Sequence, residues 1–174
     1  MNVEELKSVI RKVFHGVKLE DGVSLKQGEI CDNYGKDNNG REVTKIEYLN
    51  IPKSEITDNW ESLTLEYLDQ YPTLSYQDAK GFRYYIPAFL LSLLSFYDSG
   101  SSRSIGTLSS LYPEMGQLFE YHMSQYSLLN PEQRQAIALY LREFPNLVSL
   151  KGEDVKVVNR AFENYWKDFL PPGI

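Results

Sequence analysis

Apolar side chains recur every three or four residues along most of this chain, which is the spacing of one face of an α-helix. The first stripe consists of Val3, Leu6, Ile10, Val13, Phe14 and Val17. Asn2 and Glu5 stand where a capping box would place them, satisfying free backbone N–H groups at the start of that helix. Similar stripes predict further helices at about 54–71, 115–126, 130–144 and 155–169, and Ser24 with Gln27 could cap a short helix that ends at Gly35.

The segment 82–97 differs from the others because it is apolar on every side of a helical projection. A helix of this kind is normally surrounded by protein, so we expect it to be the core helix against which the others pack. Pro87 leaves two possibilities open. Either one helix continues through it and leaves the carbonyl of Arg83 without its helical partner, or a new helix starts with Pro87 in its first turn.

Short loops are expected between the helical stripes. The stretch from Asp32 to Gly40 is rich in acids and amides, a composition typical of a loop or hairpin turn. The apolar residues that follow it, Val43, Ile46 and Tyr48, are too sparse to predict a strand. Together the patterns predict an all-α fold: a single domain over residues 1–174, with six to eight helices packed around the apolar central helix.

The net charge of the chain indicates which kinds of partner are not expected. The 174 residues carry 18 basic and 24 acidic side chains, a net charge of −6, and residues 1–80 alone carry −5. Nucleic acids and anionic membrane surfaces attract basic proteins, so neither is expected as a partner. The acidic half is either a solvated surface or a face for a basic partner. The longest uncharged run, Tyr84–Tyr97, has 14 residues, whereas a membrane-spanning helix needs roughly 20.

The N-terminus and the cysteine content indicate a compartment. The first residues are acidic and include no apolar run, which argues against a signal peptide. The single cysteine, Cys31, excludes an internal disulfide and suits a reducing compartment. A cytoplasmic location is therefore expected. Cys31 has no evident activating base and is expected to be a buried structural thiol.

Motifs of metal or catalytic chemistry are not evident in the sequence. The two histidines, His15 and His122, have no partners at metal-ligand spacing, and His122 falls on an apolar stripe typical of a core or boundary position. The glycines near residue 40 do not match an EF-hand, and neither Gly-x-Ser-x-Gly nor a phosphate-binding loop is present. We therefore expect no metal and no cofactor, and an enzymatic role is less favoured than a binding role.

One group of residues, at the start of the central helix, carries more chemistry than the rest. In one interpretation, Arg83 pairs with Asp78 or another acid, while Tyr84 and Tyr85 anchor their hydroxyls at the core boundary. In the other, Arg83 binds a carboxylate or phosphate in a small cleft rimmed by Tyr76, Tyr84 and Tyr85. These five residues are the candidate ligand- or partner-binding site.

The same segment carries a resemblance to a known family. The run Gly-Phe-Arg-Tyr-Tyr-Ile-Pro-Ala-Phe at residues 81–89 is similar to the Phe-Arg-Tyr-Tyr-Leu-Pro-Ala signature of a bacterial family of uncharacterised small proteins, a domain of unknown function. Ile86 replaces the leucine of that signature. The resemblance covers about residues 54–166, and its other matching positions are Trp60, Leu129, Gln133, Ala136, Ile137, Tyr140, Leu141, Ala161, Tyr165 and Trp166. It implies a bacterial origin and assigns no activity and no catalytic residue.

Three functional hypotheses follow. The leading one is a noncatalytic protein-interaction module, because the chain is small and acidic and has 13 tyrosines, which are favoured at interfaces. Acidic proteins that neutralise basic toxin enzymes provide an analogy. The second is a small-ligand-binding protein or an enzyme with a pocket near Arg83, in which Asp78 or Asp32 could be the base. The third is a structural subunit of an oligomer, formed by self-association. An internal acid bound to Arg83 would favour the first hypothesis, and an unpaired Arg83 facing a concavity would favour the second.

Overall fold

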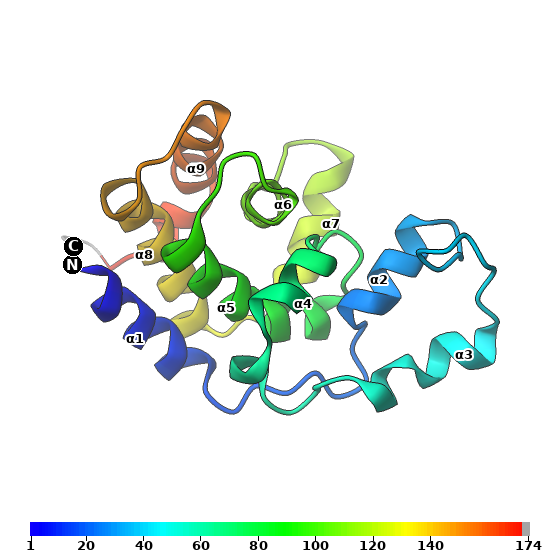
Figure 1. The fold of residues 1–174 in the computed structure, drawn as a ribbon. Helices are drawn as coiled ribbons and strands as arrows, with labels where there is room; N and C mark the ends of the chain where they lie inside the picture. The colour runs from blue at the N-terminus through cyan, green and yellow to red at the C-terminus, as the bar shows by residue number, and fades with distance from the viewer. Residues whose placement is uncertain (172–174) are drawn as a thin grey trace.

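The structure is a computed structural model that describes residues 1–171, apart from the side chain of Gln117 (Figure 1). Its α-helices are α1 (Val3–Phe14), α2 (Leu25–Asp32), α3 (Lys45–Asn50), α4 (Leu65–Gln70), α5 (Ala79–Phe96), α6 (Ser102–Ser110), α7 (Gln117–Tyr126), α8 (Pro131–Leu147) and α9 (Glu153–Asn164). Three short 3-10 helices join them: η1 (Ile51–Ser54), η2 (Trp60–Ser62) and η3 (Trp166–Phe169).

The prediction of an all-α single domain is confirmed. Within residues 1–171 the nine α-helices exceed the expected six to eight by one, and the only β-pairing is an isolated bridge between Lys36 and Glu42. The stripes did not predict α3 and α6, because both are short and carry few apolar residues. Polar caps start them instead: the Thr44 side chain accepts from the Glu47 N–H, and the Ser101 side chain accepts from the Ser104 N–H. Among the described residues, none of the helices combines the length and the hydrophobicity that a membrane-spanning segment requires.

The segment 54–71 forms separate pieces rather than the single helix that its stripe predicts. Only α4 is α-helical there, preceded by η1 and η2. Trp60 is buried in η2, and its indole N–H donates to the carbonyl of Phe14 at 2.9 Å, at the end of α1. A long-range contact therefore determines the local backbone in this segment, where periodicity alone would have continued the helix.

The central helix α5 runs without interruption from Ala79 to Phe96 and has Pro87 in its interior. The first of the two possibilities for Pro87 is therefore correct. The helices α1, α6, α7 and α8 pack around α5, which lies in the middle of the molecule in Figure 1. Between Gly81 and Leu94 its buried residues lie on all sides of the helix, which explains why they follow no single stripe, while Phe96 at its end is exposed.

Aromatic side chains from distant segments close the core around α5. The ring of Phe82 lies 5.1 Å from that of Tyr126, which in turn lies 4.9 Å from the ring of Trp166. The Trp166 indole N–H donates to the carbonyl of Leu111 at 2.7 Å. One continuous core therefore includes residues from α1 to η3, as expected of a single domain.

Residues 24–54 form an arm at one side of this core, made of α2, a turn, α3 and η1 (Figure 1). The turn is the one expected after Asp32: the Asp37 carboxylate accepts from the backbone N–H groups of Asn39 and Arg41, each at 3.0 Å. Helix α3 contains no buried residue, and its Ile46 and Leu49 are 73% and 59% exposed. Helix α3 is therefore held by its cap and the adjoining turn, whereas α2 anchors the arm to the core through the buried Leu25.

Candidate functional site

Asp78 has a structural role in the fold. Its side chain caps α5 by accepting from the backbone N–H of Gly81 at 2.8 Å, and it also accepts from the N–H of Val23 at 3.0 Å. The contact is close because Gly81 has no side chain: a Cβ at that position would lie 2.4 Å from the carbonyl oxygen of Val23. Asp78 thus joins the start of the central helix to the base of the arm.

Tyr84 and Tyr85 are fully buried, with 0% exposure, and do not rim an open cleft. The Tyr84 hydroxyl donates to the carbonyl of Ile56 at 2.9 Å, and the two tyrosine rings are in edge contact at 4.8 Å. Burial raises the pKa of both phenols. Because α5 is covered on every side, residues next to each other in sequence both point into protein.

Within residues 1–171, Arg83 neither pairs with an acid nor faces a cleft, which were the two arrangements expected from the sequence. It is partly buried, its Nε–H has no hydrogen-bond partner within the described residues, and it forms no ion pair with an acid there. It also lines none of the cavities described below. The candidate residues therefore separate: Asp78 caps the helix, Tyr84 and Tyr85 belong to the core, and Tyr76 lies at the surface.

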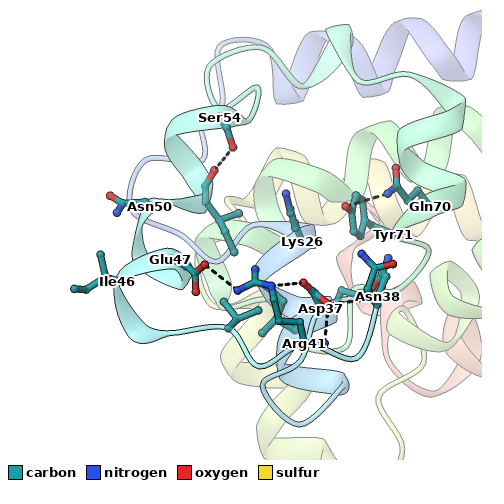
Figure 2. Close-up of a pocket in the computed structure, with 15 residues that line it drawn as sticks. Lys26, Asp37, Asn38, Arg41, Ile46, Glu47, Asn50, Ser54, Gln70 and Tyr71 are labelled. Atoms are coloured by element: carbon teal, nitrogen blue, oxygen red, sulfur yellow. Dashed lines mark hydrogen bonds and ion pairs between the residues drawn. The ribbon is translucent and has the colours of Figure 1, made fainter.

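A polar cavity lies within the arm and is bordered on the body side by Gln70 and Tyr71 (Figure 2). It has a volume of about 570 Å³ and is open to solvent, and its lining comes from α2, the turn, α3, η1 and the end of α4. Its charged residues are Lys26, Glu29, Asp37, Arg41 and Glu47. We call it the arm cavity.

Arg41 lies in the wall of the arm cavity between two carboxylates. Its guanidinium contacts Asp37 at 3.1 Å and Glu47 at 2.9 Å, as the dashed lines in Figure 2 show. The Glu47 carboxylate also accepts from the Thr44 backbone N–H and hydroxyl, each at 2.8 Å. These contacts, led by the Thr44 N–H, lower the pKa of Glu47 to about 2. One carboxylate therefore caps α3 and orients the arginine.

Lys26 and Glu29, one turn apart on α2, line the same cavity and form no ion pair with any described residue. Partial burial raises the pKa of Glu29, and the nearby Asp32 raises it further. A nearby cation would stabilise the ionised form of this carboxylate. The cavity also presents the four carboxamides of Asn38, Asn39, Asn50 and Gln70, which both donate and accept hydrogen bonds.

Sequence reasoning missed this site because the lining residues lie in the segment with the weakest periodicity. The available signals were the acidic charge of the first 80 residues and the Thr44 and Glu47 capping pattern. Neither shows that α2 and α3 enclose a cavity. No group of three or more His, Cys, Asp or Glu side chains in the described residues could hold a metal ion.

Two other sequence expectations can be compared with the structure. Cys31 was expected to be buried, but it is exposed on α2, with its sulfur 3.5 Å from the Tyr48 hydroxyl. The prediction failed because that side of α2 faces α3, within the arm, rather than the core. His122 is half-buried, which confirms the expected boundary position. Tyr76 is exposed at a second cavity, where an interaction with the Asp32 carboxylate raises its pKa.

Comparison with known proteins identifies the family of this chain but assigns no activity to it. No curated protein and no solved structure matches the chain significantly. The sequence does match one family over residues 2–170, which covers nearly all of the domain described above. The chain therefore belongs to the family of unknown function DUF6714.

Proposed function

We propose that this protein is a noncatalytic interaction module that binds a basic segment of a partner protein in the arm cavity. The observation that supports this most is the position of Glu29, a partly buried carboxylate with no ion pair among the described residues, in an open cavity next to the exposed apolar residues of α3. The partner would supply a lysine or arginine to Glu29 and apolar contacts to Ile46 and Leu49.

The energetics suit binding. Ile46 and Leu49 are among the most exposed large apolar side chains of the molecule, and full burial of each would contribute about 1.5–3 kcal/mol. Arg41 pairs with two of the three acids, Asp37 and Glu47. The lining carries three acidic and two basic side chains, a net charge of −1, which favours a positively charged ligand. The carboxamides suit recognition of peptide groups, since each offers a donor and an acceptor and none is an effective acid or base at neutral pH.

The net charge of −6 supports a basic partner in a second way, since opposite charge accelerates encounter. By analogy alone, a basic toxin enzyme neutralised by this protein is one such partner. The proposal also keeps the expected cytoplasmic location and an absence of cofactors.

The test is capture of partners from a native lysate, read by mass spectrometry, with variants that separate the arm from the rest of the surface. We expect one partner to bind wild type, to be lost with Ile46→Asp combined with Leu49→Asp, and to be weakened by Glu29→Gln and by higher salt. The matched control combines Phe96→Asp with Ile105→Asp, which are exposed to a similar extent outside the arm. The control should retain the partner.

Two results would contradict the proposal. The first is a partner that binds arm variants and wild type equally, and the second is a partner lost equally in the control. Light scattering addresses the third sequence hypothesis: a homo-oligomer that the arm variants dissociate would replace the foreign partner with a second copy of the chain.

A further inference from the structure

A second cavity lies where α6, α7 and α9 meet, and the arm cavity and the proposed function do not involve it. Its volume is about 620 Å³, within the range of small-molecule sites. Three tyrosines (Tyr76, Tyr112 and Tyr121) and His122 contribute rings to its lining. We call it the tyrosine cavity.

Hydrogen bonds hold the walls of the tyrosine cavity in place. The Tyr121 hydroxyl donates to the carbonyl of Ser75, next to Tyr76. The buried Gln125 amide donates to the carbonyls of Leu74 and Gln77, each at 2.9 Å, which attaches the loop carrying Tyr76 to α7. The ring of Tyr121 also contacts that of His122, with centroids 6.2 Å apart. The Tyr121 ring and the backbone that carries Tyr76 are therefore held in place, which reduces the entropy cost of binding a flat ligand.

The tyrosine cavity has a basic side chain that is available to a ligand. Arg160, from α9, lines it and forms no ion pair with any acid in the described part of the chain. Burial lowers the pKa of His122, which favours its neutral imidazole, although Glu114 opposes the shift. Arg160 is thus the cation that the lining offers to a ligand.

Two carboxylates near the cavity disfavour a ligand with more than one negative charge. Glu114 lines the cavity, and Asp32 interacts with the hydroxyl of Tyr76. Like charges repel at short range, so a doubly charged phosphate would be disfavoured relative to a singly charged carboxylate. A guanidinium forms two parallel hydrogen bonds with a carboxylate or a phosphate, so the neighbouring acids, and not Arg160, set the preference for the carboxylate.

We infer that the tyrosine cavity binds a small aromatic carboxylate. The aromatic ring of the ligand lies among Tyr76, Tyr112 and Tyr121, and its carboxylate pairs with Arg160. Stacking on tyrosine adds to the burial of the ring, and the guanidinium selects the carboxylate over a neutral ring.

The test is calorimetric titration of the full chain with indole-3-acetate, 3-methylindole and phenyl phosphate as probes. We expect indole-3-acetate to bind at least 10-fold more tightly than either other probe. Arg160→Gln should weaken indole-3-acetate about 10-fold and leave 3-methylindole unchanged. Tyr76→Ala should weaken both indoles. Arg11→Gln, an exposed arginine on α1, is the matched control and should change none of the three.

Nitrogen–proton correlation spectra locate the site independently. Amide shifts confined to residues of α6, α7, α9 and the loop at Tyr76 are expected on adding indole-3-acetate. Equal affinity of 3-methylindole and indole-3-acetate, unchanged binding by Arg160→Gln, shifts confined to the arm, or no binding at millimolar concentration would each overturn the inference. None of these results bears on the arm variants, so the two proposals fail separately.

Discussion

At the scale of single residues, the structure distinguishes tyrosines that are alike in the sequence pattern. Tyr126 and Tyr140 both lie on apolar stripes, and both are fully buried. The Tyr126 hydroxyl donates to the carbonyl of Ser110 at 2.6 Å, whereas the Tyr140 hydroxyl has no partner within residues 1–171. Burial raises the pKa of both phenols well above the ordinary value. An unpaired buried hydroxyl reduces stability, while a paired one does not.

The two tyrosines therefore predict opposite effects of the same substitution. Tyr140→Phe should raise the free energy of unfolding by about 1 kcal/mol, because it removes a polar group that lost its water without gaining a partner. Tyr126→Phe should lower it by about 1 kcal/mol, since the Ser110 carbonyl loses its donor. Urea unfolding measures both. A Tyr140→Phe protein less stable than wild type would show that this hydroxyl is satisfied in solution.

At the scale of elements, α3 shows how a helix forms without burial. Its capping box uses an ionised residue, Glu47, whereas the capping box of α8 uses the neutral Gln133. The folded pKa of Glu47, about 2, lies below the ordinary 4.5. The carboxylate therefore stabilises α3 fully above pH 4.5, and this contribution is lost as pH falls towards 2.

We predict that α3 loses helical structure between about pH 4.5 and pH 2 while the start of α8 does not change in the same step. Carbon chemical shifts of residues 44–50 and 130–136 measure the two helices in one sample. Glu47→Gln, which keeps the shape and removes the charge, should abolish the pH dependence at α3. Loss of both helices together would indicate global acid unfolding rather than the cap.

At the scale of the whole molecule, the chain divides into a body with one continuous core and an arm with little core of its own. The body joins α1 to η3 through buried aromatic residues, while α3 contributes no buried residue. Free energies of local opening follow burial, so the two parts should not open together.

Hydrogen exchange should show this difference directly. Amides of α3 are expected to exchange many times faster than those of the buried middle of α5, because α3 can open without exposing the core. Mass spectrometry of deuterium uptake over minutes to hours would measure both. Equal protection of α3 and α5 would contradict the division, and added partner should slow exchange in α3 if the arm is the binding surface.

Local sequence signals determined much of the fold. The stripes of α1, α7, α8 and α9 and the all-apolar segment of α5 indicated an all-α domain with a buried central helix. These signals work because periodicity and capping act over a few residues. The same reasoning assigned a turn to the residues after Asp32, but it took Asp78 as a partner of Arg83 or a base, whereas this residue caps α5.

Only the tertiary structure decided where the candidate side chains point. It covered α5 on all sides, which put Tyr84 and Tyr85 into the core and left Tyr76 at the surface. It also folded α3 back towards α2, which created the arm cavity and brought Glu47 to Arg41. A helical pattern states which residues share a face, but the neighbours of that face come from segments far away in the chain, so burial, pairing and cavities are properties of the assembled molecule.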